Sequence, residues 1–188
     1  MDNVSFMRKA KAQLAGQWTN AVLGTLVYVL VNAVLCSTYV LELVFGGPVM
    51  FGYVLFMACL CDTRSSRFEL LFKGFERFVE TLLAGLILTV AVSIGTAFLI
   101  VPGIIMATGF GMTFFIMADD ANIGGVDALK QSWNMMDGHK MDLFCLWLRF
   151  IGWGLLCVLT CGIGFIWLIP YMTASTLNFY RSLRYGRY

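Results

Sequence analysis

Long apolar runs alternate with short polar connectors along the chain. Six such runs fall near 18–41, 47–61, 79–100, 103–118, 143–159 and 162–179. A helix that crosses a bilayer needs about 20 mostly apolar residues, and the second and fourth runs are short by this measure. Runs such as "LIVPGIIMATGF" do not alternate apolar and polar positions, so they are unlike the strands of a membrane barrel. The pattern predicts an all-α, polytopic membrane protein with about six transmembrane helices.

Three of the connectors are very short and contain residues that break helices. They are "GGP" at 46–48, which ends in Pro48, "VPG" at 101–103, which contains Pro102 and Gly103, and "CGIG" at 161–164. Proline fixes φ and lacks an N–H donor, while glycine allows positive φ. We expect these segments to form tight outer turns between paired helices.

Pro170 falls inside the sixth run, where it should kink the helix and free the carbonyl of Ile166. Thr173 or a neighbouring helix would then satisfy that carbonyl.

The longer, polar connectors carry a helical pattern of their own. In "RFELLFKGFERFVE" one stripe holds the apolar residues Phe68, Leu71, Phe72, Phe75, Phe78 and Val79. Weaker versions of this pattern occur at 4–14, with Val4, Met7 and Leu14, and at 126–136, and each precedes a pair of apolar runs. The chain therefore reads as a single integral membrane domain, 1–188, of three repeat-like units near 4–62, 66–120 and 124–182. Each unit would be an amphipathic helix followed by a helical hairpin. The amphipathic helices would lie in the headgroup layer or pack on the ends of the bundle.

Composition supports a membrane environment. Hydrophobic residues make up 60% of the 188 residues and charged residues only 13%, and the mean hydropathy is +0.81. A soluble domain usually carries about 25% charged residues. No Lys/Arg-rich run with interleaved aromatic residues is present, so the sequence does not indicate nucleic-acid binding.

The basic residues give an orientation. Every Lys and Arg except Arg149 lies before the first run, after the last run or in a polar connector: Arg8, Lys9, Lys11, Arg64, Arg67, Lys73, Arg77, Lys130, Lys140, Arg181, Arg184 and Arg187. Cytoplasmic segments of membrane proteins are enriched in these residues. We therefore expect both termini in the cytoplasm. The first run is too long for the core of a signal peptide, and we expect it to remain as an anchor.

Arg149 is the one basic residue inside an apolar run. If the helix starts near residue 143, Arg149 lies roughly 9 Å along it, close enough for its side chain to reach the cytoplasmic headgroups. It would otherwise pair with one of the acids near cytoplasmic span ends, Asp62, Glu80, Asp119 or Asp120, or bind an anionic ligand or lipid headgroup. The sequence leaves these three interpretations open.

Other polar residues offer little chemistry. His139 is the only histidine and stands beside Lys140 in a polar turn, where both side chains are candidates for headgroup contact. Asp119 and Asp120 are adjacent, so they point in different directions on a helix and make a poor catalytic pair. The six cysteines lack the spacing of a zinc site. We expect no catalytic, cofactor-binding or metal site, and no enzymatic activity.

Three C-terminal stretches together resemble a known family. They contain "LIVPGI", "MMDGHKMDLF" and "GIGFIWLIPYM" followed by "NFYRSL". The sequence is similar, over roughly 66–183, to a bacterial family of small integral membrane proteins classified as domain of unknown function nine-seven-five. The resemblance implies a multi-helix protein of the bacterial cytoplasmic membrane. It brings no activity and no catalytic residue.

Two functional classes follow. One is a non-enzymatic scaffold or interaction protein, whose partners would be anionic headgroups at the amphipathic helices, another membrane protein or a second copy of the chain. The other is a small transporter or channel for an ion or a small anionic or lipid-like ligand. A continuous polar cavity that reaches Arg149 would favour transport, and a dry core would favour the scaffold.

Overall fold

Helices make up nearly all of the part of the chain that the structure describes. The computed structural model describes residues 3–35, 39–63, 67–98, 100–160 and 162–186, and it contains no strand within them. The elements are α1 (Asn3–Leu14), α2 (Trp18–Leu35), α3 (Tyr39–Thr63), the 3₁₀ helix η1 (Phe68–Phe75), α4 (Phe78–Phe98), α5 (Ile100–Phe110), α6 (Thr113–Asp119), α7 (Gly125–Met135), α8 (Lys140–Leu159) and α9 (Phe165–Tyr185). The predicted all-α class is confirmed.

Five helical stretches are long and apolar enough to cross a membrane. They are Trp18–Leu35, Leu41–Thr63, Phe78–Ala97, Val101–Asp119 and Lys140–Leu159. This is the make-up of a multi-pass membrane protein. The sixth predicted span forms most of α9, which is helical but less apolar. Residues 174 to 180 of α9 are all buried, so the protein itself shelters this helix.

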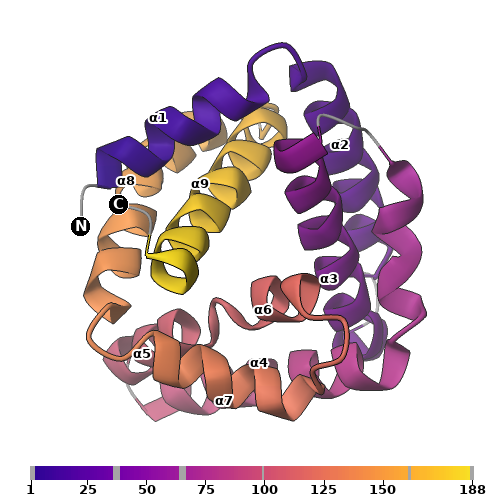
Figure 1. Ribbon diagram of the computed structural model, residues 1–188, viewed down its shortest axis with the longest axis vertical. Helices are drawn as coiled ribbons and strands as arrows, with labels where there is room; N and C mark the ends of the chain where they lie inside the picture. The colour runs from indigo at the N-terminus through magenta and orange to yellow at the C-terminus, as the bar shows by residue number, and fades with distance from the viewer. Residues whose placement is uncertain (1–2, 36–38, 64–66, 99, 161, 187–188) are drawn as a thin grey trace.

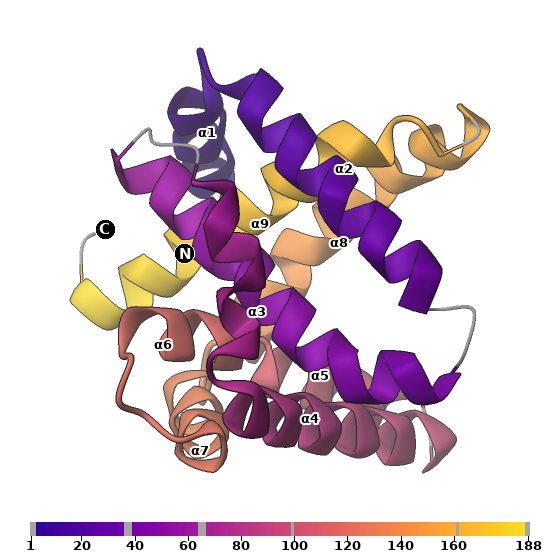
Figure 2. The same cartoon turned by 90° about the vertical axis from the view of Figure 1, so that its right-hand side faces the viewer.

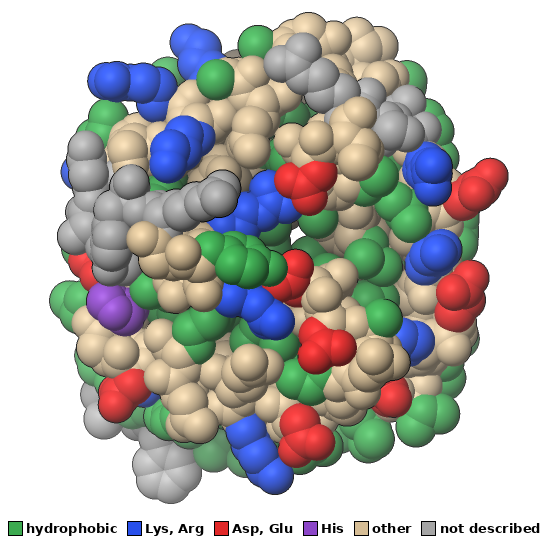
Figure 3. Space-filling view, viewed as in Figure 1, with side chains coloured by type: hydrophobic (Ala, Val, Ile, Leu, Met, Phe, Trp, Pro, Cys, Tyr) green, Lys and Arg blue, Asp and Glu red, His purple; other side chains and the backbone are tan. Residues whose placement is uncertain are grey.

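The three helical hairpins point the same way. The end of α2 and the start of α3 lie on one side of the molecule, together with the corresponding ends of α4 and α5 and of α8 and α9 (Figure 2). The elements α1, η1 and α7 and the C-terminal end of α9 lie on the opposite side. This second side carries many Lys, Arg, Asp and Glu side chains (Figure 3), and we call it the charged face.

Each connecting element packs on a hairpin that belongs to another part of the chain. Element η1 packs on α3, α7 packs on α4 and α5, and α1 packs on α8 and α9. The last of these contacts joins the beginning of the chain to its end and closes the helices into a ring (Figure 1). The order of elements fits the three predicted units, but the division into units stays a prediction.

The amphipathic connectors bury one face and expose the other. In α1 the buried stripe is Phe6, Ala10 and Leu14, whereas Val4, which the sequence placed on the apolar face, is 43% exposed. In η1 Leu71 is buried, but Phe72 is 58% exposed. These elements therefore pack on the ends of the hairpins and still present apolar side chains outward.

The turn predicted at 46–48 is wrong. Pro48 lies inside the continuous helix α3, which begins at Tyr39, while α2 ends at Leu35. A Cβ on Gly47 would lie 2.3 Å from the Thr81 carbonyl oxygen, so the glycine serves a close crossing of α3 and α4. Proline removes only one hydrogen bond from the helix, and tertiary packing offsets that loss.

The second predicted turn is displaced by a few residues. Pro102 and Gly103 fall in the first turn of α5, where proline is well tolerated; α4 ends at Phe98 and α5 begins at Ile100. Gly103 instead packs against Thr96, since a Cβ there would be 2.7 Å from the Thr96 Cγ2.

The third predicted turn is confirmed, with Gly162 at φ +85° between α8 and α9. Cys161, together with Cys36, Arg64 and Arg187, lies outside the described residues.

Pro170 is inside α9 as expected, but the predicted role of Thr173 is wrong. The Thr173 hydroxyl donates to the Ile169 carbonyl at 3.0 Å rather than to Ile166.

Candidate functional site

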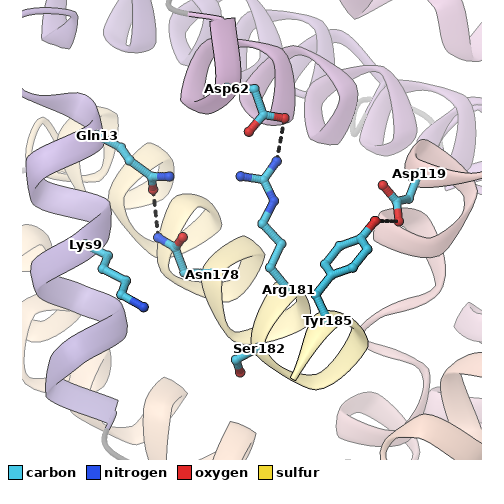
Figure 4. Close-up of a pocket in the computed structure, with 8 residues that line it drawn as sticks. All are labelled: Lys9, Gln13, Asp62, Asp119, Asn178, Arg181, Ser182 and Tyr185. Carbon is cyan, nitrogen blue, oxygen red and sulfur yellow. Dashed lines mark hydrogen bonds and ion pairs between the residues drawn. The ribbon is translucent and has the colours of Figure 1, made fainter. Parts of the chain in front are cut away.

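A polar cavity of about 670 Å³ opens on the charged face. It lies between α1, the end of α3, the end of α6 and α9, and it forms the hollow in the middle of this face (Figure 3). Its lining residues are Lys9, Gln13, Asp62, Asp119, Asn178, Arg181, Ser182 and Tyr185 (Figure 4). We call this cavity the polar basin.

Helix periodicity explains which residues reach the polar basin. Asn178, Arg181, Ser182 and Tyr185 are spaced i, i+3, i+4 and i+7, so they lie on one face of α9. On α1, the residues Lys9 and Gln13 have the spacing i, i+4, while Phe6, Ala10 and Leu14 form the buried stripe. The basin is thus built mainly from the polar faces of the first and last helices.

Two contacts tie α9 to its neighbours across the basin. Arg181 Nη2 donates to Asp62 Oδ2 at 2.6 Å and links α9 to the end of α3. Asn178 Nδ2 donates to Gln13 Oε1 at 2.8 Å and links α9 to α1. The Arg181 side chain is 27% exposed and that of Asp62 is 52% exposed, so water competes for this ion pair.

A denser cluster surrounds Asp119 at the end of α6. Its Oδ2 atom accepts from Tyr185 at 2.7 Å and from Tyr180 at 3.1 Å, and it pairs with Arg184 Nε at 2.9 Å. Arg184 Nη1 also donates to the Tyr180 hydroxyl at 2.8 Å.

Both tyrosines of this cluster are held in the neutral form. Burial and the negative charge of Asp119 raise the pKa of Tyr180, and the hydrogen bond to Asp119 raises the pKa of Tyr185. The tyrosines therefore act as donors, and Arg184 pairs with the carboxylate that accepts from them. A carboxylate in this arrangement suits a structural junction better than a general base.

Aromatic side chains join the helices that line the polar basin. The Phe6 and Phe179 rings meet edge to face with centroids 5.6 Å apart, and the Phe115 and Tyr180 rings stack at 6.0 Å. All four belong to a buried cluster that also contains the fully buried Met112 and Ile116.

Hydroxyl groups in the middle of α9, just before the residues that line the polar basin, donate hydrogen bonds to carbonyls of the same helix. Ser175 donates to the Tyr171 carbonyl at 2.8 Å, and Thr176 donates to the Met172 carbonyl at 2.9 Å. These two hydroxyls are therefore used within α9, and neither residue lines the polar basin.

Arg149 lies away from the polar basin. Its side chain is exposed on α8, next to the buried Phe150, and it is not part of the lining. Among the described residues no ion pair joins Arg149 to any acid.

The acids proposed as partners of Arg149 have other contacts. Asp62 pairs with Arg181, Glu80 with Arg77 and Asp119 with Arg184. Asp120 Oδ1 accepts from the Asn122 backbone N–H at 2.9 Å.

His139 and Lys140 lie at the start of α8 rather than in the polar basin. His139 Nδ1 is 3.3 Å from Asp142 Oδ2. The Lys140 Nζ lies 3.6 Å from the centroid of the Trp133 ring. Within the described ranges, no three His, Cys, Asp or Glu side chains gather as a metal site would require.

Sequence reasoning missed most of the polar basin. It singled out Asp62 and Asp119 but none of the α9 residues or Lys9 as site residues. A usable signal was present, because "NFYRSLRY" places polar side chains at helical spacing at the end of an apolar run. That stripe indicates a polar helix face that needs either water or polar neighbours.

The C-terminal part of the chain matches a known family. Residues 98–186 match the model of the family described as protein of unknown function (DUF975). The resemblance inferred from the sequence is confirmed over this stretch. The DUF975 match covers α5 to α9 and therefore includes Asp119 and the α9 face of the polar basin. No match to the chain was found among the curated proteins or among the solved structures.

Proposed function

We propose that the protein is a non-enzymatic interaction protein of the bacterial cytoplasmic membrane. It binds a polar partner of mixed charge in the polar basin and does not carry that partner across the membrane. The observation that supports this proposal best is the basin itself, which is lined by both signs of charge. A translocation path would instead need polar groups through the middle of the membrane.

The charged face and both termini are assigned to the cytoplasm. The basic residues of α1, η1, α7 and the end of α9 belong to elements on one side of the molecule (Figure 2). Excess Lys and Arg near span ends favours the cytoplasmic side. The polar basin is then open to cytoplasmic molecules.

The lining favours a partner that carries both charges. Lys9 is exposed and has no ion-pair partner among the described residues. The contacts of Asp62 and Asp119 use Oδ2, which leaves the Oδ1 atom of each as an acceptor. A partner with an anionic group near Lys9 and a cationic group near the aspartates meets charges of the opposite sign at both ends.

Enzymatic chemistry has little support at this site. Asp62 and Asp119 each pair with an arginine, and His139, the only histidine, lies on another element. A hydrolytic or transfer reaction needs a base within reach of a nucleophile, and the basin offers no such pair among its lining residues.

Native mass spectrometry of protein extracted in a mild detergent tests the proposal. We expect the wild type to retain a small polar adduct that Lys9→Glu loses. Lys11→Glu is the matched control, because Lys11 is also exposed on α1 but does not line the basin. If the wild type carries no adduct, or if the two variants behave alike, the polar basin is not the binding site.

A further inference from the structure

A second cavity, away from the polar basin, lies at the periphery of the ring. It has a volume of about 430 Å³ and is bounded by α4, α5 and α7. Its walls are Ile87, Phe110, Leu129 and Trp133, and Lys130 and Asn134 form a polar edge. We call this cavity the α7 groove.

Tight contacts at the N-terminal end of α7 fix this wall of the groove. A Cβ on Gly125 would lie 2.2 Å from the Glu80 carbonyl oxygen, so the start of α7 rests directly on α4. Just before α7, the Arg77 guanidinium donates to the Ile123 carbonyl and pairs with Glu80.

The middle and end of α7 are equally constrained. A Cβ on Gly109 would lie 2.6 Å from the Trp133 ring, and the Phe110 and Trp133 rings are 5.2 Å apart. Ser132 Oγ donates to the Gly109 carbonyl at 2.8 Å. The α7 groove is therefore preformed, as binding cavities usually are.

Exposed apolar residues on α4 lie within one helical turn of Ile87, which lines the groove. Val79, Leu83, Leu86 and Val90 repeat along one face of α4 and are 65%, 44%, 36% and 44% exposed. Val126, at the edge of the groove, is 42% exposed. Because α4 is long and apolar enough to span a membrane, this stripe is where acyl chains would lie.

The lining of the groove also carries positive charge, from Lys130. The Lys130 side chain is 72% exposed, and its contact with the equally exposed Asp127 is 3.6 Å long. An exposed pair of this kind exchanges readily with another anion. Lys140 does not line the groove, but its ammonium group is held over the ring of Trp133, which does. The site thus combines positive charge, an aromatic ring and an apolar wall. A phospholipid fits this combination, because its phosphate is anionic and its acyl chains are apolar.

We propose that the α7 groove binds one anionic phospholipid, with the phosphate at Lys130 and Lys140 and one acyl chain against Ile87 and Phe110. This site is independent of the polar basin, which shares none of its residues.

An internal comparison is available at η1. A smaller cavity of about 60 Å³ lies between η1 and the α2–α3 hairpin. Among the residues that the structure describes, its lining is apolar apart from Tyr28 and contains no lysine or arginine. This cavity resembles the α7 groove in its apolar lining but lacks the lysine, so we expect selectivity for an anionic headgroup only at the α7 groove.

The test is native mass spectrometry of delipidated protein in detergent with added dioleoylphosphatidylglycerol or dioleoylphosphatidylcholine. We expect the wild type to keep one phosphatidylglycerol at an activation energy that removes phosphatidylcholine. The double variant Lys130→Gln with Lys140→Gln should bind phosphatidylglycerol about 30-fold more weakly. Each lysine near an anionic lipid contributes about a fivefold factor to the affinity. Lys73→Gln on η1 is the matched control and should leave binding unchanged.

A second variant keeps the test independent of charge. Val126→Trp fills the mouth of the groove from an exposed position, so it should fold and yet lose the lipid. Equal retention of both lipids, or equal retention by the wild type and the lysine variant, would mean annular lipid only and would overturn the proposal. Loss in Val126→Trp without loss in the lysine variant would also overturn it, because the headgroup would then not be recognised.

Discussion

The Asp119 cluster should hold the charged face together more strongly than the Asp62–Arg181 pair. The substitution Asp119→Asn removes a carboxylate that accepts hydrogen bonds from Tyr180 and Tyr185 and forms an ion pair with Arg184. Hydrogen bonds to a charged group contribute about 1.5–3 kcal/mol when well shielded. Asp119 is 32% exposed and an amide oxygen still accepts, so we expect a total loss of about 2 kcal/mol.

Asp62→Asn is the comparison for this prediction. It removes a single ion pair whose acid is 52% exposed, and such pairs contribute about 0–1 kcal/mol. For a soluble chain of this size, a loss of about 2 kcal/mol in the free energy of unfolding lowers Tm by roughly 4–8 °C, which is the change we expect for Asp119→Asn. We expect Asp62→Asn to lower Tm by at most about 4 °C.

Tryptophan fluorescence during heating in detergent measures both variants, since the chain has five tryptophans. The double variant Asp119→Asn with Arg184→Gln isolates the coupling between the two side chains. We reason that three contacts to one carboxylate stabilise the protein more than one short ion pair does. Equal losses of Tm for the two aspartate variants, or a larger loss for Asp62→Asn, would refute this reasoning.

Three further predictions follow from single sites. The pKa of Tyr180 is raised in the folded protein, so the contribution of this tyrosine to stability is complete below the unfolded pKa of about 10 and is lost as pH rises above it. We therefore expect the Tm of the wild type to fall between about pH 8 and 11, and Tyr180→Phe should make that fall smaller. Gly47→Val should lower Tm sharply or abolish folding, since even a Cβ would lie 2.3 Å from the Thr81 carbonyl oxygen; Gly152→Val, at a glycine with open space, should be tolerated and is the control. Arg149→Leu should leave folding and the basin adduct unchanged, and proteoliposomes of the wild type should pass no more ions than protein-free vesicles; ion flux that Arg149→Leu abolishes would instead support the transporter alternative.

The helices of this protein are predictable because their signal is local. The apolar runs predicted six spans in their correct order; five stretches of the described chain are long and apolar enough to span, and the sixth run forms most of α9. The basic connectors predicted that the polar elements share one side of the molecule (Figure 2). The turn at Pro48 was wrong for a tertiary reason. Gly47 and Pro48 look like turn residues locally, but the glycine lets α3 approach α4 closely, and no local pattern reports that crossing.

The site was harder to predict because it is assembled from four separate elements. Asp62 and Asp119 stood out as charges at span ends, and Arg149 stood out as a charge within a span. Sequence alone does not say which arginine reaches which acid. In the folded protein Arg181 and Arg184, both on α9, take the two aspartates, and Arg149 faces outward.

The position of α9 explains why the polar basin is on the charged face. Its C-terminal half carries Asn178, Arg181, Ser182 and Arg184, which would be costly against lipid. The closing contact of α1 with α9 covers the apolar side of this half, with Phe6 against Phe179, and leaves its polar side turned toward Asp62 and Asp119. The ring thus covers one side of this polar helix end and leaves the other side lining the polar basin, whereas the α7 groove lies at the periphery of the ring. The two proposed binding surfaces therefore differ in chemistry.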